Sequence, residues 1–123
     1  MSAIEDRLAK LGVALPQAAA PVANYVPAVV TGNLLVISGQ LALGPDGKLA
    51  DRHQGKLGAE VSDEAGKEAA RFCAINLLAQ AKAALGGDLS RLTRCVRLGG
   101  FINAVPTYAG LAPIMNGASD LMV

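Results

Sequence analysis

Aromatic residues are scarce in this chain of 123 residues: they make up 3% of it, and tryptophan is absent. Proteins that bind single-stranded nucleic acids stack the bases on aromatic side chains, so the chain offers few residues for such a platform. The formal net charge is only +1, which indicates neither a basic surface for nucleic acid nor an acidic tail. Composition therefore argues against nucleic acid as the main partner.

Long apolar runs, metal ligands and glycine-rich phosphate loops are missing as well. No run approaches the ~20 apolar residues of a membrane span, and the charged start MSAIEDRLAK lacks a secretory hydrophobic segment. One histidine and two distant cysteines cannot close a metal site, and neither G-x-G-x-x-G nor G-x-x-x-x-G-K-[ST] occurs. We therefore expect a cytoplasmic protein without a membrane or metal partner, in which Cys73 and Cys95 are buried thiols.

Apolar residues, in contrast, make up 52% of the chain, with a mean hydropathy of +0.38 and 17% charged residues. This composition excludes a disordered chain. The length corresponds to one domain, residues 1–123, with one core. Another subunit is expected to cover part of the apolar surface, so we predict an oligomer.

The first half of the chain predicts a helix, a connector and a hairpin. Residues 2–11 place apolar side chains on one side of a helix, and a glycine follows as a stop. The helix and a connector make up residues 1–24, and Pro16, Pro21 and Pro27 keep the chain extended up to the first strand. Residues 25–30 and 34–41 are rich in β-branched and apolar residues, and the Gly-Asn between them suits a two-residue turn. A short third strand is predicted within residues 48–60.

The second half predicts two helices and a strand. Alanines and leucines recur at 3.6-residue spacing over residues 63–85, after a serine that suits an N-cap. Residues 92–103 have strand composition. Pro106 suits the start of a last helix, which Pro113 and Gly117 are expected to break into pieces. Because such a sheet would keep an open edge, we also expect a further segment after residue 123.

The stretch TGNLLVISGQ, residues 31–40, raises the question of what its end holds. Strand-forming residues stop on Ser38-Gly39-Gln40, a composition that suits a pocket lined by backbone. A simple strand end is the alternative, because glycine often marks a close approach of two backbones without any ligand.

Together with Tyr25, the turn Pro45-Asp46-Gly47 and the run Gly86–Leu92, this stretch resembles the RidA family, also called the YjgF type. The ordered match covers residues 25–108, whereas the run NGASDLM at residues 116–122 and the extra N-terminal helix look like a divergent branch of the family. The resemblance implies an α+β fold of the chorismate-mutase-like type, a mixed β-sheet with two helices packed on one face, plus an N-terminal helix. It also implies a homotrimer whose clefts between subunits hydrolyse enamines and imines, such as 2-aminoacrylate, to 2-keto acids and ammonia without a cofactor.

Carried over position by position, the resemblance implies that Tyr25, Ser38 and Gly39 line the substrate cleft. The family's cleft asparagine falls on Ala112, and Asn116, four residues later, is the candidate that remains. The family's carboxylate-binding arginine and water-positioning glutamate belong to C-terminal strands that residues 1–123 do not contain. The catalytic residues are therefore unknown.

Two further residues have ordinary interpretations. His53 lies in a polar loop and is expected to be solvated, and Cys95 is expected to be an inert thiol in a strand. Three functions remain open. The chain is an imine or enamine deaminase, a non-catalytic trimer that binds small carboxylate or carbonyl metabolites, or an RNA-binding or RNA-cleaving protein with a basic stripe of Arg91, Arg94 and Arg97.

Overall fold

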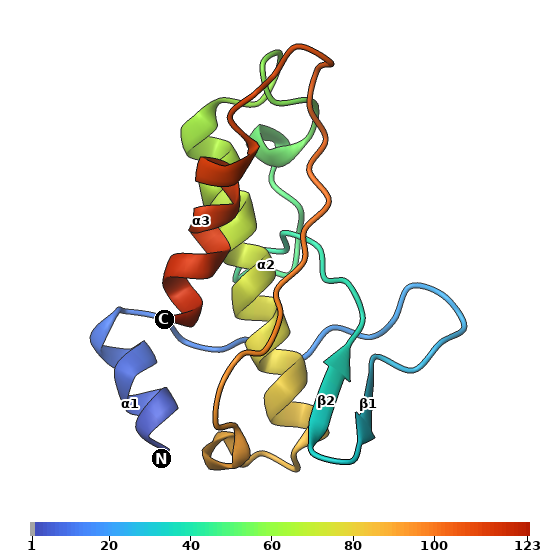
Figure 1. Ribbon diagram of the computed structural model, residues 1–123, viewed down its shortest axis with the longest axis vertical. Coiled ribbons are helices and arrows are strands. Elements are labelled where there is room, and N and C mark those ends of the chain that lie inside the picture. Colours follow the sequence, from blue (N-terminus) through green and yellow to red (C-terminus); the bar gives the residue numbers. More distant parts are fainter. Residues whose placement is uncertain (1) are drawn as a thin grey trace. The chain divides into compact units, whose positions relative to one another are not determined.

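The structure of the chain is a computed structural model that describes residues 2–123. The described residues form an α+β fold with three α-helices, two β-strands and two short 3-10 helices (Figure 1). In chain order they are α1 (Ala3–Lys10), β1 (Ala28–Thr31), β2 (Leu34–Ile37), η1 (Asp51–His53), α2 (Asp63–Ala84), η2 (Leu89–Arg91) and α3 (Leu111–Met122).

These residues fall into two compact units. The first unit comprises the chain up to Gln40 together with Ile75–Cys95, and the second comprises Leu41–Ala74 together with Val96–Val123. Helix α2 contributes its second half to the first unit and its first half to the second. None of the helices in the described part of the chain is long and apolar enough to cross a membrane.

Helix α1 begins where the sequence predicts. The Ser2 hydroxyl accepts a hydrogen bond from the backbone N–H of Glu5 at 3.2 Å and donates one to the Glu5 carboxylate at 3.3 Å. The first bond satisfies a backbone N–H that the first turn leaves without a partner, and the second joins the two side chains. Gly12, with a φ of 74°, follows the end of the helix. The predicted N-terminal helix is confirmed.

The core of the first unit lies between α1, the second half of α2 and η2. Its buried residues are small or aliphatic, and Leu89 of η2 is fully buried. Lys82 of α2 forms an ion pair with Glu5 of α1 at 3.3 Å. This pair lowers the pKa of the Glu5 carboxyl, chiefly through the hydrogen bond from Lys82. Helix α1 therefore docks on its unit, as its apolar side predicts.

The predicted hairpin is present, with shorter strands than expected. Val29 pairs with Val36 and Thr31 with Leu34 in an antiparallel ladder, and Gly32 supplies the positive φ of 57° that the turn needs. Val29, Leu34 and Val36 share one face, and each is about half exposed. A two-stranded hairpin is marginally stable alone, because it gains most of its stability from a packed apolar face. This half-exposed face and the unpaired outer edge of β1 could therefore both contact another part of a protein.

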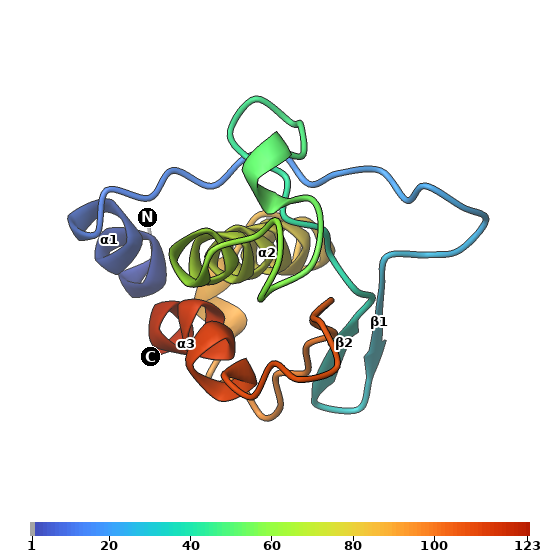
Figure 2. The same cartoon turned by 90° about the horizontal axis from the view of Figure 1, so that it is seen from above.

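In the second unit, α3 lies alongside the first half of α2 and runs parallel to it (Figures 1 and 2). Leu57, Val61 and Ile114 form the core of this unit. At the start of the two helices, the Tyr108 hydroxyl donates a hydrogen bond to Asp63 at 2.7 Å. The same bond raises the pKa of the Tyr108 hydroxyl.

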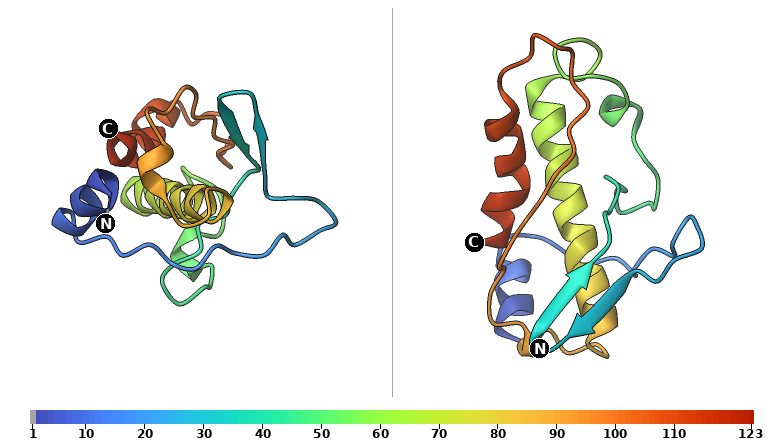
Figure 3. Two further views of the ribbon diagram at one scale, coloured as in Figure 1. Left: turned by 90° about the horizontal axis from the view of Figure 1, so that it is seen from below. Right: turned by 45° about the vertical axis from the view of Figure 1, so that its right-hand side comes forward.

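The expected breaks in the last helix are wrong. Helix α3 begins at Leu111, five residues after Pro106, and runs without interruption to Met122 (Figure 3). Pro113 stands in its first turn, where a backbone N–H is not needed. Gly117 lies where α3 touches the backbone of α2, because a Cβ atom at this position would lie 2.1 Å from the carbonyl oxygen of Lys67. This glycine therefore allows close helix packing.

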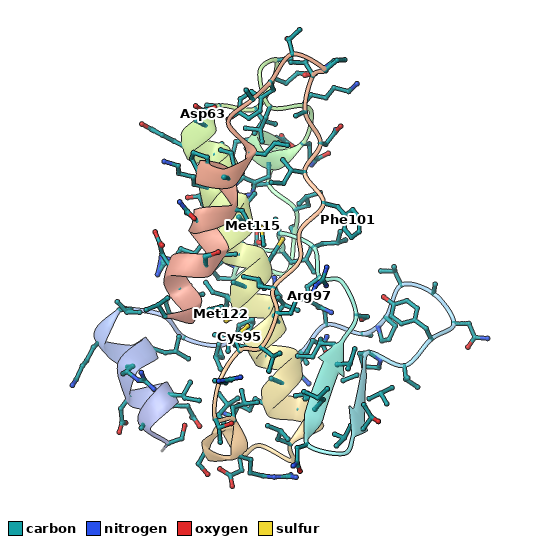
Figure 4. All side chains as sticks on the ribbon, viewed as in Figure 1. Asp63, Cys95, Arg97, Phe101, Met115 and Met122 are labelled. Carbon is teal, nitrogen blue, oxygen red and sulfur yellow. The ribbon has the colours of Figure 1, made fainter. Side chains whose placement is uncertain are left out.

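Two predicted strands are absent from the described part of the chain. Residues 48–60 contain η1 and only isolated bridges of Leu43 with Leu49 and of Leu57 with Val61 and Ala104. Gly55 and Gly58 have positive φ values of 126° and 84°, which interrupt an extended run. Residues 92–103 belong to no strand, and Phe101 projects fully exposed from this segment (Figure 4). The predicted mixed sheet is thus reduced here to a hairpin.

Candidate functional site

The end of β2 forms a corner, Ser38–Gln40, in which nearly every polar group of Ser38 is engaged. Its backbone N–H donates to the carbonyl of Pro27 at 2.9 Å, which extends the hairpin ladder by one pair. Its carbonyl accepts a hydrogen bond from the Gln40 side chain at 3.2 Å. Its hydroxyl is buried and has no hydrogen-bond partner among the described residues. Ser38 therefore has one uncommitted group, the hydroxyl.

Gly39 next to it has the opposite surroundings. The residue is exposed, and a Cβ atom built on it would meet nothing within 4 Å. Neither its N–H nor its carbonyl forms a hydrogen bond within the part of the chain that the structure describes. Unpaired backbone groups at an open position bind a ligand or a neighbouring molecule without displacing an internal bond.

Helix α2 supports this corner through a glutamine. Gln80 is 4% exposed, and its amide nitrogen donates to the carbonyl of Ala19 at 2.7 Å and to the Gln40 side-chain oxygen at 3.3 Å. The three groups form a continuous chain of hydrogen bonds from Gln80 through Gln40 to the Ser38 carbonyl. Gln80 is not among the predicted site residues, because a polar residue on the alanine-rich side of a helix does not reveal which distant groups it bonds to.

The other predicted site residues come from both units of the chain. Tyr25 belongs to the same unit as the corner, lies in a bend before β1 and is 44% exposed. No hydrogen bond among the described residues joins its hydroxyl to the corner. Asn116 and Ala112 are exposed on α3 in the second unit. Within the first unit the structure brings Ser38 and Gly39 together with Gln40, whereas Asn116 belongs to the second unit.

The prediction of a solvated His53 is wrong. Its side chain is fully buried, its Nε2 lies 2.7 Å from a carboxylate oxygen of Glu68, and its ring meets Phe72 edge-on at 5.3 Å. The Nδ1 atom is buried and has no partner among the described residues. Helix η1 turns the ring onto α2, a tertiary contact that the polar neighbours of His53 do not reveal.

Glu68 also forms an ion pair with Arg52, whose Nε donates a hydrogen bond to the same carboxylate oxygen at 2.5 Å. Hydrogen bonds from Arg52 and then from His53 lower the pKa of the Glu68 carboxyl. Both basic residues come from η1, and Glu68 comes from α2. The cluster therefore fastens η1 to the helix within the second unit.

Comparison with known proteins assigns the chain to a family. The sequence profile described as "YjgF/chorismate_mutase-like, putative endoribonuclease" matches residues 5–123. The chain belongs to the YjgF/chorismate-mutase-like family. The resemblance to the YjgF type is confirmed, and so is the chorismate-mutase-like α+β fold class.

Individual proteins resemble the chain in sequence and structure. The protein TCP17 of Trypanosoma cruzi is 43% identical over 120 residues, which cover 98% of this chain and 72% of TCP17. A crystal structure of an Agrobacterium tumefaciens protein of unknown function is 46% identical with a TM-score of 0.84, covering 96% of this chain and 70% of that one. A crystal structure from Shewanella oneidensis MR-1, described as a "putative endoribonuclease", has 38% sequence identity and a TM-score of 0.89. The match covers 96% of this chain and 76% of the Shewanella chain.

The two cysteines of this YjgF-family chain differ in exposure. Neither is in a disulfide. Cys73 on α2 is half-buried, and burial raises the pKa of its thiol. Cys95 is exposed in the extended segment after η2 (Figure 4), so the prediction that it is buried is wrong. An apolar strand composition predicts burial, but this segment does not form a strand of a covered sheet.

Proposed function

We propose that the chain binds a small metabolite with a carboxylate or carbonyl group at the Ser38–Gly39 corner and hydrolyses reactive enamines or imines there to 2-keto acids and ammonia. The observation that carries the binding proposal is the buried, unpartnered hydroxyl of Ser38 beside the uncommitted backbone of Gly39. A buried hydroxyl without a partner costs the folded chain about 1–3 kcal/mol. Because the hydroxyl is buried in the single chain, a ligand oxygen reaches it when the Ser38 side chain turns outward, and the hydrogen bond then formed removes that cost.

The proposed reaction needs more than the corner. An enamine first takes a proton on carbon to become an imine; water then adds to the imine carbon, the C–N bond breaks, and ammonia leaves with the proton that it needs. Ser38 and Gly39 hold the substrate's oxygen atoms, and Tyr25 forms a wall in this proposal. The cation for the carboxylate and the proton donor come from residues outside the corner.

A neighbouring copy of the chain completes the cleft in this proposal, within a homotrimer. The support is the half-exposed apolar face of the hairpin, which leads directly into the corner. Buried between copies, that face would exclude water from the cleft and protect a reactive imine until the attacking water is in place. The whole protein is proposed to act in the cytoplasm.

The test of the proposal is Ser38→Ala. Pyruvate, the keto acid that 2-aminoacrylate yields, is titrated calorimetrically, and keto-acid release is followed after a 2-aminoacrylate-generating enzyme is added. The variant is expected to lose pyruvate binding while its melting temperature stays unchanged or rises, because no internal bond is lost. Ser119→Ala is the matched control, since that hydroxyl already donates to the Met115 carbonyl at 3.3 Å. Wild-type protein that binds no pyruvate and releases no keto acid rejects the proposal.

A non-catalytic binder is the second candidate, favoured by Ala112 where the resemblance places an asparagine. It predicts pyruvate binding without any acceleration of keto-acid release. The same two measurements therefore separate it from the deaminase.

RNA binding or cleavage is the third candidate. The description of the Shewanella protein and the exposure of Arg91, Arg94 and Arg97 favour it, and the net charge of +1 and the few aromatic residues oppose it. Binding through phosphate contacts weakens steeply with salt. If filter retention of a mixed-sequence RNA is absent at 50 mM salt, this candidate is rejected.

A further inference from the structure

A buried glutamine of α2, Gln80, is linked to the corner by hydrogen bonds through Gln40. Both amide hydrogens of Gln80 are used, one on the Ala19 carbonyl and one on the Gln40 oxygen. Turning the amide over would place its oxygen against the Ala19 carbonyl, so only one orientation of Gln80 is favourable. The orientation of a buried amide, unlike that of a surface amide, is therefore fixed by its partners.

The orientation of Gln80 determines that of Gln40. Because Gln80 donates to the Gln40 oxygen, the Gln40 nitrogen must face the other way, and it donates to the Ser38 carbonyl at 3.2 Å. The Ser38 N–H already donates to the Pro27 carbonyl. Both backbone groups of Ser38, the N–H and the carbonyl, are therefore engaged. The hydroxyl of Ser38 alone remains for a ligand.

We propose that Gln80 is a positioning residue for ligand binding at the Ser38–Gly39 corner and acts solely through Gln40. The identity of the ligand rests on the proposed function, whereas the effect of Gln80 on the orientation of the Ser38–Gly39 peptide does not. Gln80 touches no ligand. Its effect is to hold the Ser38 carbonyl and so to fix the direction of the Gly39 N–H, which belongs to the same planar peptide group.

The test uses three variants, Gln80→Met, Gln40→Met and the double variant. Methionine keeps the length of the side chain and removes the amide. In the absence of ligand, the backbone amide signal of Gly39 is followed by ¹H–¹⁵N NMR; with ligand, the Kd for pyruvate is measured. Each single variant is expected to move the Gly39 signal and to weaken pyruvate binding about five- to tenfold, the effect of one lost hydrogen bond.

The double variant distinguishes positioning from a general structural role. If Gln80 acts through Gln40, the double variant binds pyruvate no more weakly than the weaker single variant. Gln54→Met is the control, because the Gln54 amide also donates to a backbone carbonyl, that of Leu49 at 3.2 Å, but takes no part in the chain of bonds. It is expected to leave both the Gly39 signal and the Kd unchanged.

Several results overturn the inference. They are a folded Gln80→Met protein with the wild-type Kd, penalties that add in the double variant, or a Gly39 signal that does not move. If Gln80→Met fails to fold, the test falls to Gln40→Met, because Gln40 is only half-buried. A Gln40→Met protein with an unmoved Gly39 signal or the wild-type Kd for pyruvate then overturns the inference. If wild-type protein binds no pyruvate, the proposed ligand is rejected, whereas Gln80 is still judged on the Gly39 signal.

Discussion

The backbone of Gly117 in α3 touches the carbonyl of Lys67 in α2 so closely that a Cβ atom at position 117 would lie 2.1 Å from the carbonyl oxygen. The obstacle is backbone inside a helix, which cannot move aside as a flexible side chain can. The close approach of α2 and α3 therefore depends on the absence of a side chain at this position.

Gly117→Ala is expected to lower the free energy of unfolding by about 2–3 kcal/mol, because the two helices must separate. Alanine has a higher helix propensity than glycine, by about 1 kcal/mol. Without the contact to the Lys67 carbonyl, Gly117→Ala would therefore be expected to raise the free energy of unfolding. Urea denaturation measures the difference. Asp120→Ala, at an exposed position of the same helix, is the control. An alanine variant as stable as the wild type would contradict the helix packing.

Gly39→Ala is expected to leave stability unchanged within about 0.5 kcal/mol, since nothing lies within 4 Å of the added methyl group. The same methyl group would stand where the proposed ligand meets the backbone. Pyruvate binding should therefore fall at least tenfold, measured by calorimetry. Unchanged affinity would mean that no ligand approaches Gly39.

Glu68→Gln is expected to destabilise the chain at neutral pH, by less than about 1 kcal/mol because Glu68 and Arg52 are partly exposed. The pKa of Glu68 is lowered in the folded state, so its stabilisation is present above the unfolded value, about 4.3, and is lost as the pH falls through the folded value. The difference between wild type and variant should therefore vanish in acid. Thermal unfolding at several pH values measures it, with the exposed Asp51→Asn as control.

The two thiols are expected to react at different rates. Cys95 is exposed, whereas Cys73 is half-buried and its pKa is raised, which leaves less thiolate. With iodoacetamide at pH 8, peptide mass spectrometry should show Cys95 alkylated before Cys73 in the native chain and at equal rates in denaturant. Equal native rates would contradict the difference in burial.

Sequence reasoning succeeded where the signal is local. Ser2 caps α1, Gly32 forms the hairpin turn, and the periodicity of α2 fixes its bounds within a residue or two. The RidA-type motif led to the confirmed family. Each of these features is set by residues that are neighbours in the chain.

It failed where contacts between distant residues decide. Gly117 suggested a helix break, yet the glycine serves the packing of α3 on α2. His53 suggested a solvated loop, yet Glu68 and Phe72 bury it. Gln80 carried no motif, because its partners Ala19 and Gln40 are far from it in the sequence. Propensity and periodicity do not contain such information.

The hairpin also has a consequence for the chain during synthesis and storage. Between Lys10 and Asp46 no residue is charged, so the strands lack the gatekeeper charges that commonly flank aggregation-prone segments. Pro27 precedes β1, but the face of Val29, Leu34 and Val36 stays about half exposed in the single chain. In the proposed trimer this face is covered, so nascent or diluted copies would be the ones that aggregate, and the yield of protein would fall when the copies assemble slowly.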